Sequence, residues 1–353
     1  MTTSREDLIA ALEGEQPERV PFTIYHRGCV LANPDPAWEG LFAQGLCPVA
    51  FATIVRRTTP NVERIVRAET WRGGPAERTI LRTPVGEISQ LSARGWVQEY
   101  WLKVPADYAV MEYVVRDTHL DPHPQAVADA YRDAEQKVGE HGIVLIGAGR
   151  SPMQTILVDY AGLESFSYHL ADGFPGLFAL AEALLDQLLE ECSLIAAGPG
   201  RYVELWENLS AEIWGPRRFA QVHLPVYERV LPILHAGGKK VFTHFDGKLA
   251  CLAGLIAGTE IDGIESLTQP PEGDMSYAEA RAAWPGKFLW GNINVSLYDL
   301  PPEELRRAVQ QMARDAAPDG RLLAFEISED LPRNWRESIP VVLEALTASS
   351  PGQ

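Results

Sequence analysis

Short apolar runs alternate with longer segments of helical periodicity along most of the chain. The alternation is most regular in the C-terminal half. Strands that are almost continuously apolar and that alternate with helices are typical of a parallel sheet. The predicted strands are 19–25, 48–55, 142–147, 202–206, 240–245, 263–267, 287–293 and 322–327, and the predicted helices include 127–140, 176–196, 215–235, 276–284, 302–316 and 335–347.

About eight β-then-α units can be counted, and eight such units close into a (β/α)8 TIM barrel. A doubly wound open sheet is the alternative, but no glycine-rich dinucleotide fingerprint follows the first strand. An N-terminal helix with Ser4 as its N-cap precedes the barrel. Residues 62–103 alternate polar and apolar positions around Gly73-Gly74, which predicts an inserted region of antiparallel hairpins. Because no low-complexity linker interrupts the chain, we expect residues 1–353 to form one domain.

Composition narrows the class of partner. The 353 residues carry a formal net charge of −17, which disfavours nucleic acid and anionic lipid. The four cysteines (Cys29, Cys47, Cys192 and Cys251) are scattered without a C-x-x-C pair, which disfavours a disulfide framework and a cysteine zinc site. With no signal peptide and no apolar run long enough to span a bilayer, we expect a cytoplasmic protein. Its partner would be a small molecule or another protein, and a homodimer is left open.

The candidate chemistry centres on His244 and Asp246, at the end of predicted strand 240–245. Side chains two residues apart in a strand point the same way, so an imidazole and a carboxylate converge there. In a TIM barrel the C-terminal ends of the strands carry the chemistry. This pair therefore predicts a ligand or catalytic site at the barrel mouth.

Acids and amides also follow the neighbouring predicted strands. Like charges at a partly desolvated edge raise one another's pKa, and a bound cation relieves the repulsion. One imidazole with two or three carboxylates suits zinc or another divalent metal. Singly, a strand-end Glu more often caps a helix, and His244 could equally be a hydrogen-bonded core histidine. The predicted metal ligands are Glu207, His244, Asp246 and Glu326, with Glu204 in reserve; the other acids and amides at strand ends are Glu265, Asn292, Asn294, Glu329 and Asp330.

Other residues at the predicted mouth are candidates for substrate binding. Arg150 lies in a glycine-rich loop and could pair with a carboxylate or phosphate, although a solvent-facing Arg in a turn is the simpler interpretation. Arg27 follows the first strand, and Asn294 follows strand 287–293. Trp206 could stack on an aromatic or quaternary-ammonium substrate, although packing in the core is the simpler role.

Several segments together carry a family resemblance. RTPVGEISQL with WVQEYWLKVP, GAGRSPMQTILVDYAGLESF and GPRRFAQVHLPVYERVL resemble segments of the uroporphyrinogen decarboxylase superfamily. That group includes the porphyrin decarboxylase and the barrel-type methyltransferases that work with corrinoid proteins. The resemblance covers most of the chain and implies a TIM barrel.

The methyltransferase branch binds zinc through a His-x-Cys pair and a later Cys. The corresponding positions here are His244, Asp246 and Glu326, so the resemblance implies a metal site with harder ligands. It implies a metal-dependent methyltransferase or demethylase that exchanges a methyl group between a small substrate and a corrinoid carried by a partner protein. Glu207, Glu265 and Asn292 are the expected catalytic residues. No Asp-x-His-x-x-Gly segment is present, so the corrinoid would come on a separate protein.

Two alternatives remain. The porphyrin decarboxylase carries an Arg-Gln-Ala-Gly-Arg motif after its first strand, of which this chain keeps only Arg27 within Tyr25-His26-Arg27-Gly28-Cys29. Residues 48–55 also lack the Asp that the decarboxylase has after its second strand. A metal-free decarboxylase is therefore the second hypothesis, and a non-catalytic barrel subunit is the third.

Overall fold

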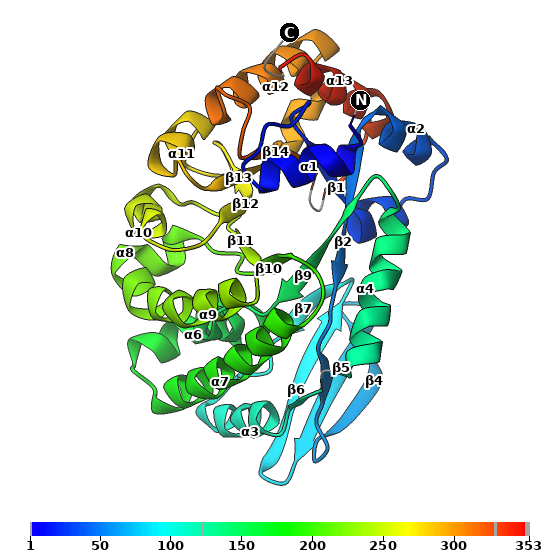
Figure 1. The fold of residues 1–353 in the computed structure, drawn as a ribbon. Coiled ribbons are helices and arrows are strands. Elements are labelled where there is room, and N and C mark those ends of the chain that lie inside the picture. The colour runs from blue at the N-terminus through cyan, green and yellow to red at the C-terminus, as the bar shows by residue number, and fades with distance from the viewer. Residues whose placement is uncertain (1, 122, 328–329, 350–353) are drawn as a thin grey trace. The chain divides into compact units, whose positions relative to one another are not determined.

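The computed structural model describes residues 2–121, 123–327 and 330–349. Eight parallel strands close into a barrel (Figure 1), which confirms the predicted (β/α)8 TIM barrel. In order around the barrel, the strands are β1 (Phe22–Tyr25), β2 (Leu46–Ala52), β9 (Ile143–Ala148), β10 (Tyr202–Leu205), β11 (Lys240–His244), β12 (Gly263–Thr268), β13 (Phe288–Asn292) and β14 (Leu323–Ile327).

The helices predicted at 127–140, 176–196, 276–284, 302–316 and 335–347 each lie close to a described helix. The described helices are α1 (Ser4–Leu12), α2 (Ala37–Gln44), α3 (Pro105–Arg116), α4 (Pro124–Val138), α5 (Pro152–Thr155), α6 (Gly162–Ala171), α7 (Pro175–Ala197), α8 (Ala211–Val222), α9 (Leu224–Ala236), α10 (Ala253–Ala257), α11 (Tyr277–Ala283), α12 (Pro302–Ala316) and α13 (Trp335–Thr347), with short turns η1 (His26–Leu31), η2 (Ile156–Ala161), η3 (Ala250–Leu252) and η4 (Val295–Asp299). Among the described residues, no helix combines the length and the apolar character that crossing a bilayer requires.

The chain forms two compact units. The barrel unit comprises Met1–Ile54, Gln125–Ala148 and Gly198–Gln353, and the insertion unit comprises Val55–Pro124 and Gly149–Ala197. The single domain expected over residues 1–353 stays a prediction.

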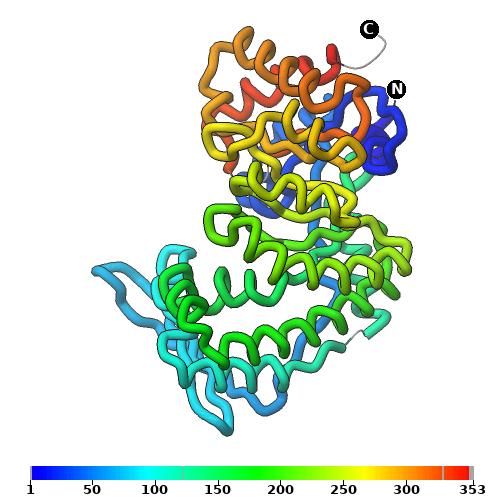
Figure 2. Tube along the Cα trace, turned by 90° about the vertical axis from the view of Figure 1, so that its left-hand side faces the viewer, coloured from blue at the N-terminus to red at the C-terminus, as the bar shows by residue number. Residues whose placement is uncertain are grey.

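The insertion unit contains the predicted hairpins. Its main sheet is an antiparallel meander, visible as the long blue and cyan hairpins in Figure 2. A second sheet of two short strands pairs residues far apart in the sequence. The meander strands are β4 (Glu63–Trp71), β5 (Gly74–Thr83), β6 (Gly86–Ala93) and β7 (Trp96–Glu99), and the small sheet pairs β3 (Arg56–Thr58) with β8 (His119–Asp121).

Two local expectations are corrected. The N-cap of α1 is Thr3 rather than Ser4, because Thr3 and Glu6 form a reciprocal capping box while the Ser4 hydroxyl donates to the His141 carbonyl at 2.9 Å. The helix predicted over 215–235 is two helices, α8 and α9, which meet at His223. Gly215 lies at φ 58° and Pro216 follows it, so the chain is also kinked near the start of α8.

The barrel interior is built in layers, because alternate residues of each strand point inward. Inward residues toward the N-terminal ends of the strands pack together with α1, whose Leu8 and Leu12 are buried. Helix α1 therefore closes the N-terminal end of the barrel, and Glu13 just after it pairs with Arg201 at 2.6 Å. The buried cluster is Leu8, Ala11, Leu12, Cys47, Val49, Ile143, Leu145, Tyr202, Phe242, Phe288, Trp290 and Ala324.

We predict that Thr23→Val destabilises the barrel by about 1–3 kcal/mol, because the buried indole N–H of Trp290 loses its acceptor. Thr23 Oγ1 accepts from Trp290 Nε1 at 2.9 Å and donates to the Phe325 carbonyl at 3.2 Å. Urea unfolding measures the loss. In a Trp290→Phe background the same change should cost clearly less, and an equal cost in both backgrounds would contradict the assignment.

Candidate functional site

At the C-terminal end of the barrel, each strand contributes one last inward-facing residue. We call these eight residues the mouth layer. Each stands two positions after an inward residue of the layer below, as strand alternation requires. Polar and titratable residues fill most of this layer, whereas the layer below is mostly apolar, with Thr23 as a polar exception. The mouth layer is Tyr25, Phe51, Gly147, Glu204, His244, Glu265, Asn292 and Glu326.

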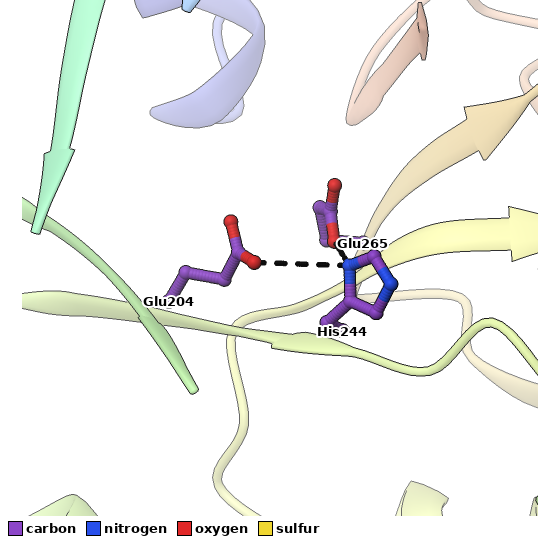
Figure 3. Close-up of side chains that lie close together, drawn as sticks. All are labelled: Glu204, His244 and Glu265. Carbon is purple, nitrogen blue, oxygen red and sulfur yellow. Dashed lines mark hydrogen bonds and ion pairs between the residues drawn. The ribbon is translucent and has the colours of Figure 1, made fainter. Parts of the chain in front are cut away.

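His244 is the centre of the mouth layer. Its Nδ1 lies 2.5 Å from Glu265 Oε2 and 3.7 Å from Glu204 Oε1. Figure 3 shows the two carboxyl groups approaching this nitrogen from different directions. The Tyr25 hydroxyl donates to the other Glu265 oxygen at 2.5 Å, so β1, β12 and β11 are joined by one chain of hydrogen bonds.

Carboxyl oxygens in this layer are buried without N–H or hydroxyl donors. Glu204 and Glu326 are 1% and 0% exposed. Among the described residues, Glu204 Oε2 has no hydrogen-bond partner, and neither oxygen of Glu326 accepts from an N–H or hydroxyl donor, although the Glu326 and Glu265 carboxyl groups lie within hydrogen-bond reach of each other. A buried, unsatisfied oxygen is costly, roughly 1–3 kcal/mol or more, so this arrangement favours a bound group that supplies positive charge.

On the other side of the imidazole, His244 Nε2 lies 3.6 Å from Asp246 Oδ2. The same oxygen accepts from Asn208 Nδ2 at 3.2 Å. Asn208 has φ 47°, a left-handed conformation that asparagine tolerates better than most residues. The loop after β10 therefore holds the carboxylate that faces the outer nitrogen of His244.

The electrostatics follow from burial and crowding. Burial lowers the pKa of His244, but the carboxylates of Glu265, Asp246 and Glu204 outweigh it and hold this pKa well above its ordinary value. Burial raises the pKa of Glu204 and Glu326 well above the ordinary range, and the charge of Glu265 adds to both shifts. In the absence of a metal ion, Glu204, Glu326 and His244 therefore keep their protons to higher pH than the free side chains do.

A bulge in β12 positions Glu265. Between Ile264 and Leu267 the pairing with β13 shifts by one residue, and Ser266 takes φ 58°. Glu265 is still in register with His244 on β11. The extra residue thus lies just beyond the carboxylate and leaves its contact with His244 undisturbed.

The donor set suits a divalent ion. Glu204, His244 and Glu265 each offer a ligand atom, and these atoms lie within 4.8 Å of one another. One imidazole nitrogen with carboxylate oxygens is a donor set found for zinc and for harder divalent metals. The oxygens of Glu204 and Glu326 that lack an N–H or hydroxyl donor also fit a cation. These residues therefore could hold the predicted metal.

Three of the four predicted ligands lie in or beside the group around His244, and the fourth, Glu207, lies beside Tyr227. His244 and Asp246 converge as expected, and Glu326 lies in the same layer, close enough to Glu265 for that carboxylate to raise the pKa of Glu326. Glu207 is buried beside Tyr227, where burial and the Glu207 carboxylate raise the pKa of that tyrosine. Its position has a local reason: Glu207 N–H donates to the Leu205 carbonyl at 2.9 Å, so the chain turns directly after β10.

The predicted substrate residues are dispersed. Arg27 is exposed in η1, and Arg150 belongs to the insertion unit, where it donates to Asp159 at 3.0 Å. Trp206 is 37% exposed, and its ring packs on Gly147, where a Cβ would lie 2.6 Å from it. Asn294 is buried and donates to the Gln269 carbonyl at 3.2 Å. Their roles in binding stay predictions.

Two titratable residues of this layer were not among the preferred site residues predicted from the sequence. Tyr25 was seen only as part of a strand, and Glu204 was held in reserve behind Glu207. Alternation was the available signal, because Tyr202 faces the core and Glu204, two residues later, must also point inward. The hydrogen bond from Tyr25 joins residues 240 positions apart, and no local pattern reports such a contact.

A cavity of ≈ 200 Å³ opens beside His244. Its other polar side chains come from Asp246, Ser266, Asn292, Tyr298 and Asp330. Asn292, predicted as catalytic, thus borders the space that a substrate could occupy. Glu329 lies outside the described residues.

Comparisons with known proteins support the fold. No protein-family model matches the chain, and no curated protein matches it. A methyltransferase from Methanosarcina mazei is similar in structure, with a TM-score of 0.58, 13% sequence identity and 99% of each chain covered. The tandem GH20 catalytic modules of a pneumococcal exo-β-D-N-acetylglucosaminidase match with a TM-score of 0.34, 10% identity, and 74% of this chain and 72% of theirs covered. At 13% identity the first similarity shows a shared fold alone.

We predict that the metal-free protein loses stability as the pH rises. The unfolded chain titrates its carboxyls near the ordinary value of 4.5. Above that pH the folded state binds more protons than the unfolded state, so the free energy of unfolding falls until the raised folded pKa values are passed. His244, whose pKa is also raised, acts in the same direction above its ordinary value of 6.5.

Glu326→Gln should therefore stabilise the chelated protein by roughly 1–3 kcal/mol near pH 8 and change it little near pH 5, as measured by urea unfolding. Glu182→Gln, at an exposed position of α7, is the matched control. A Glu326→Gln protein whose stability falls with pH as steeply as that of the wild type would contradict the prediction.

Proposed function

We propose that the chain is a metal-dependent methyltransferase or demethylase of the uroporphyrinogen decarboxylase superfamily. It would exchange a methyl group between a small substrate and a corrinoid on a separate partner protein. The observation that carries the proposal is the group of buried glutamates around His244, with carboxyl oxygens that accept from no N–H or hydroxyl donor among the described residues. The similarity in fold to a methyltransferase over 99% of both chains agrees with it.

The metal would be held by Glu204, His244 and Glu265, with Glu326 next to them. This set modifies the ligands expected from the sequence. Glu204 and Glu265 replace Glu207, which lies beside Tyr227, and Asp246, which faces the other ring nitrogen of His244. Zinc remains the first candidate, and the preponderance of oxygen donors also suits harder divalent metals. When bound, the ion would act as a Lewis acid on the atom that the methyl group leaves.

The chain's own residues would do the rest. Glu265 fixes the ring of His244, and Tyr25 fixes Glu265 by donating to its second oxygen. Ligating carboxylates are themselves usually hydrogen-bonded, so the bond from Tyr25 would hold the other oxygen of Glu265 toward the metal. Asn292 and Asp246 border the cavity beside His244, where they would orient the substrate.

We predict that the purified protein binds about one equivalent of divalent metal. His244→Ala and Glu204→Gln should each lower metal affinity, by tenfold or more, because each removes a donor. Glu207→Gln is the matched control: it is equally buried, and it should keep the metal. Elemental analysis after dialysis against zinc measures the content. Wild-type protein that stays metal-free would reject the proposal and favour the decarboxylase alternative.

We predict that methyl transfer depends on that metal. With free cob(I)alamin as acceptor and a panel of small methyl ethers and methylated amines, methylcobalamin should form with the zinc-loaded wild type. The rate of methylcobalamin formation should be lower by about a hundredfold or more in the chelated protein, because no metal polarises the atom that the methyl group leaves. The absorbance change of the corrinoid gives the rate. Equal rates with and without metal would disprove the metal's role, and release of CO2 from a porphyrinogen would indicate a decarboxylase.

A further inference from the structure

The cavity beside His244 has features that select its ligand. Its volume of ≈ 200 Å³ lies below the roughly 300–1,000 Å³ typical of sites for drug-sized molecules. Ile293, Val295 and Ile327 supply apolar wall, and Asp246 and Asp330 supply carboxylates. None of the described residues that line it is Lys or Arg. The ligand must therefore be small and must tolerate a negative field.

Tyr298 adds an independent indication. It lines the cavity and is 1% exposed, and within the described part of the chain its hydroxyl has no hydrogen-bond partner. A buried hydroxyl without a partner is costly, about 1–3 kcal/mol. A bound molecule with an oxygen atom would supply the missing acceptor.

The charge of the site remains negative after a metal is counted. Glu204, Glu265 and Glu326 stand in the mouth layer next to the cavity wall formed by His244 and Asp246. One divalent ion offsets two of these carboxylate charges, and Asp246 and Asp330 still face the cavity. A negative field in a partly enclosed cleft favours cations and repels anions.

We propose that this cavity binds a small organic cation that carries an oxygen acceptor, such as an ammonium alcohol or its methyl ether. Asp246 and Asp330 attract the cationic end, and the Tyr298 hydroxyl donates to the oxygen. The apolar wall accommodates alkyl groups on the nitrogen. The inference depends on the proposed function only in treating this cation as the substrate.

The test compares three molecules of similar shape by calorimetry with zinc-loaded protein: choline, its neutral isostere 3,3-dimethyl-1-butanol, and the anion 3,3-dimethylbutyrate. Choline should bind at least about tenfold more tightly than the alcohol, and the anion should not bind measurably. Asp330→Asn should weaken choline and leave the alcohol unchanged. Tyr298→Phe should weaken both by roughly three- to tenfold, the effect of one hydrogen bond.

Thermal unfolding separates binding from folding, because Tyr298→Phe removes a hydroxyl without a partner and should leave Tm unchanged or higher. Equal affinity for choline and the alcohol, tighter binding of the anion, or no binding of any probe would overturn the proposal. Metal content is measured on the same samples. Choline binding by a protein that takes up no zinc would support the cation site and reject the proposed function. Zinc uptake without choline binding would reject the cation site and leave the proposed function standing.

Discussion

The burial of several carboxyl groups around one histidine is the constraint on which the upper half of the barrel depends. Three adjacent strands, β10 to β12, bring Glu204, His244 and Glu265 together, and β14 adds Glu326. Charged groups this deep are expensive to desolvate, and they repel one another unless protons or a cation are shared between them. The strands therefore hold the mouth layer in place, together with the hydrogen bonds that Glu265 makes with His244 and Tyr25.

The opposite end of the barrel supplies the rigidity that such a site needs. There, cationic side chains are bound to backbone carbonyls instead of crowding together. Lys239 Nζ donates to the carbonyls of Gly198 and Gly200 at 2.7 and 2.6 Å, and Arg281 donates to those of Ala316 and Leu322 at 2.6 and 2.9 Å. These bonds fix the loops that precede the strands. Stability and chemistry are thus assigned to opposite ends of the same strands, as in other TIM barrels.

The fold was predictable from sequence because its signal is local. Apolar runs bounded by glycine and proline gave the strands, and α12 and α13 begin and end at the predicted residues. The candidate site was predictable only in part. His244 and Asp246 are two residues apart, so strand alternation alone brings them together. Choosing Glu204 over Glu207 requires knowing that β10 ends at Leu205, which the sequence does not show. The contact of Tyr25 with Glu265 forms only because the barrel closes and brings β1 near β12.

The bulge at Ser266 has a consequence for how this barrel could change over time. Glu265 lies before the extra residue and shares the register of β11, whereas Leu267 and Thr268 lie after it and follow the register of β13. Substitutions or insertions in the loop that follows β12 would leave the direction of the Glu265 side chain unchanged. The part of the mouth that contacts the ligand can therefore diversify while the histidine and its carboxylates are inherited unchanged, so that new specificities can evolve on a constant reactive centre.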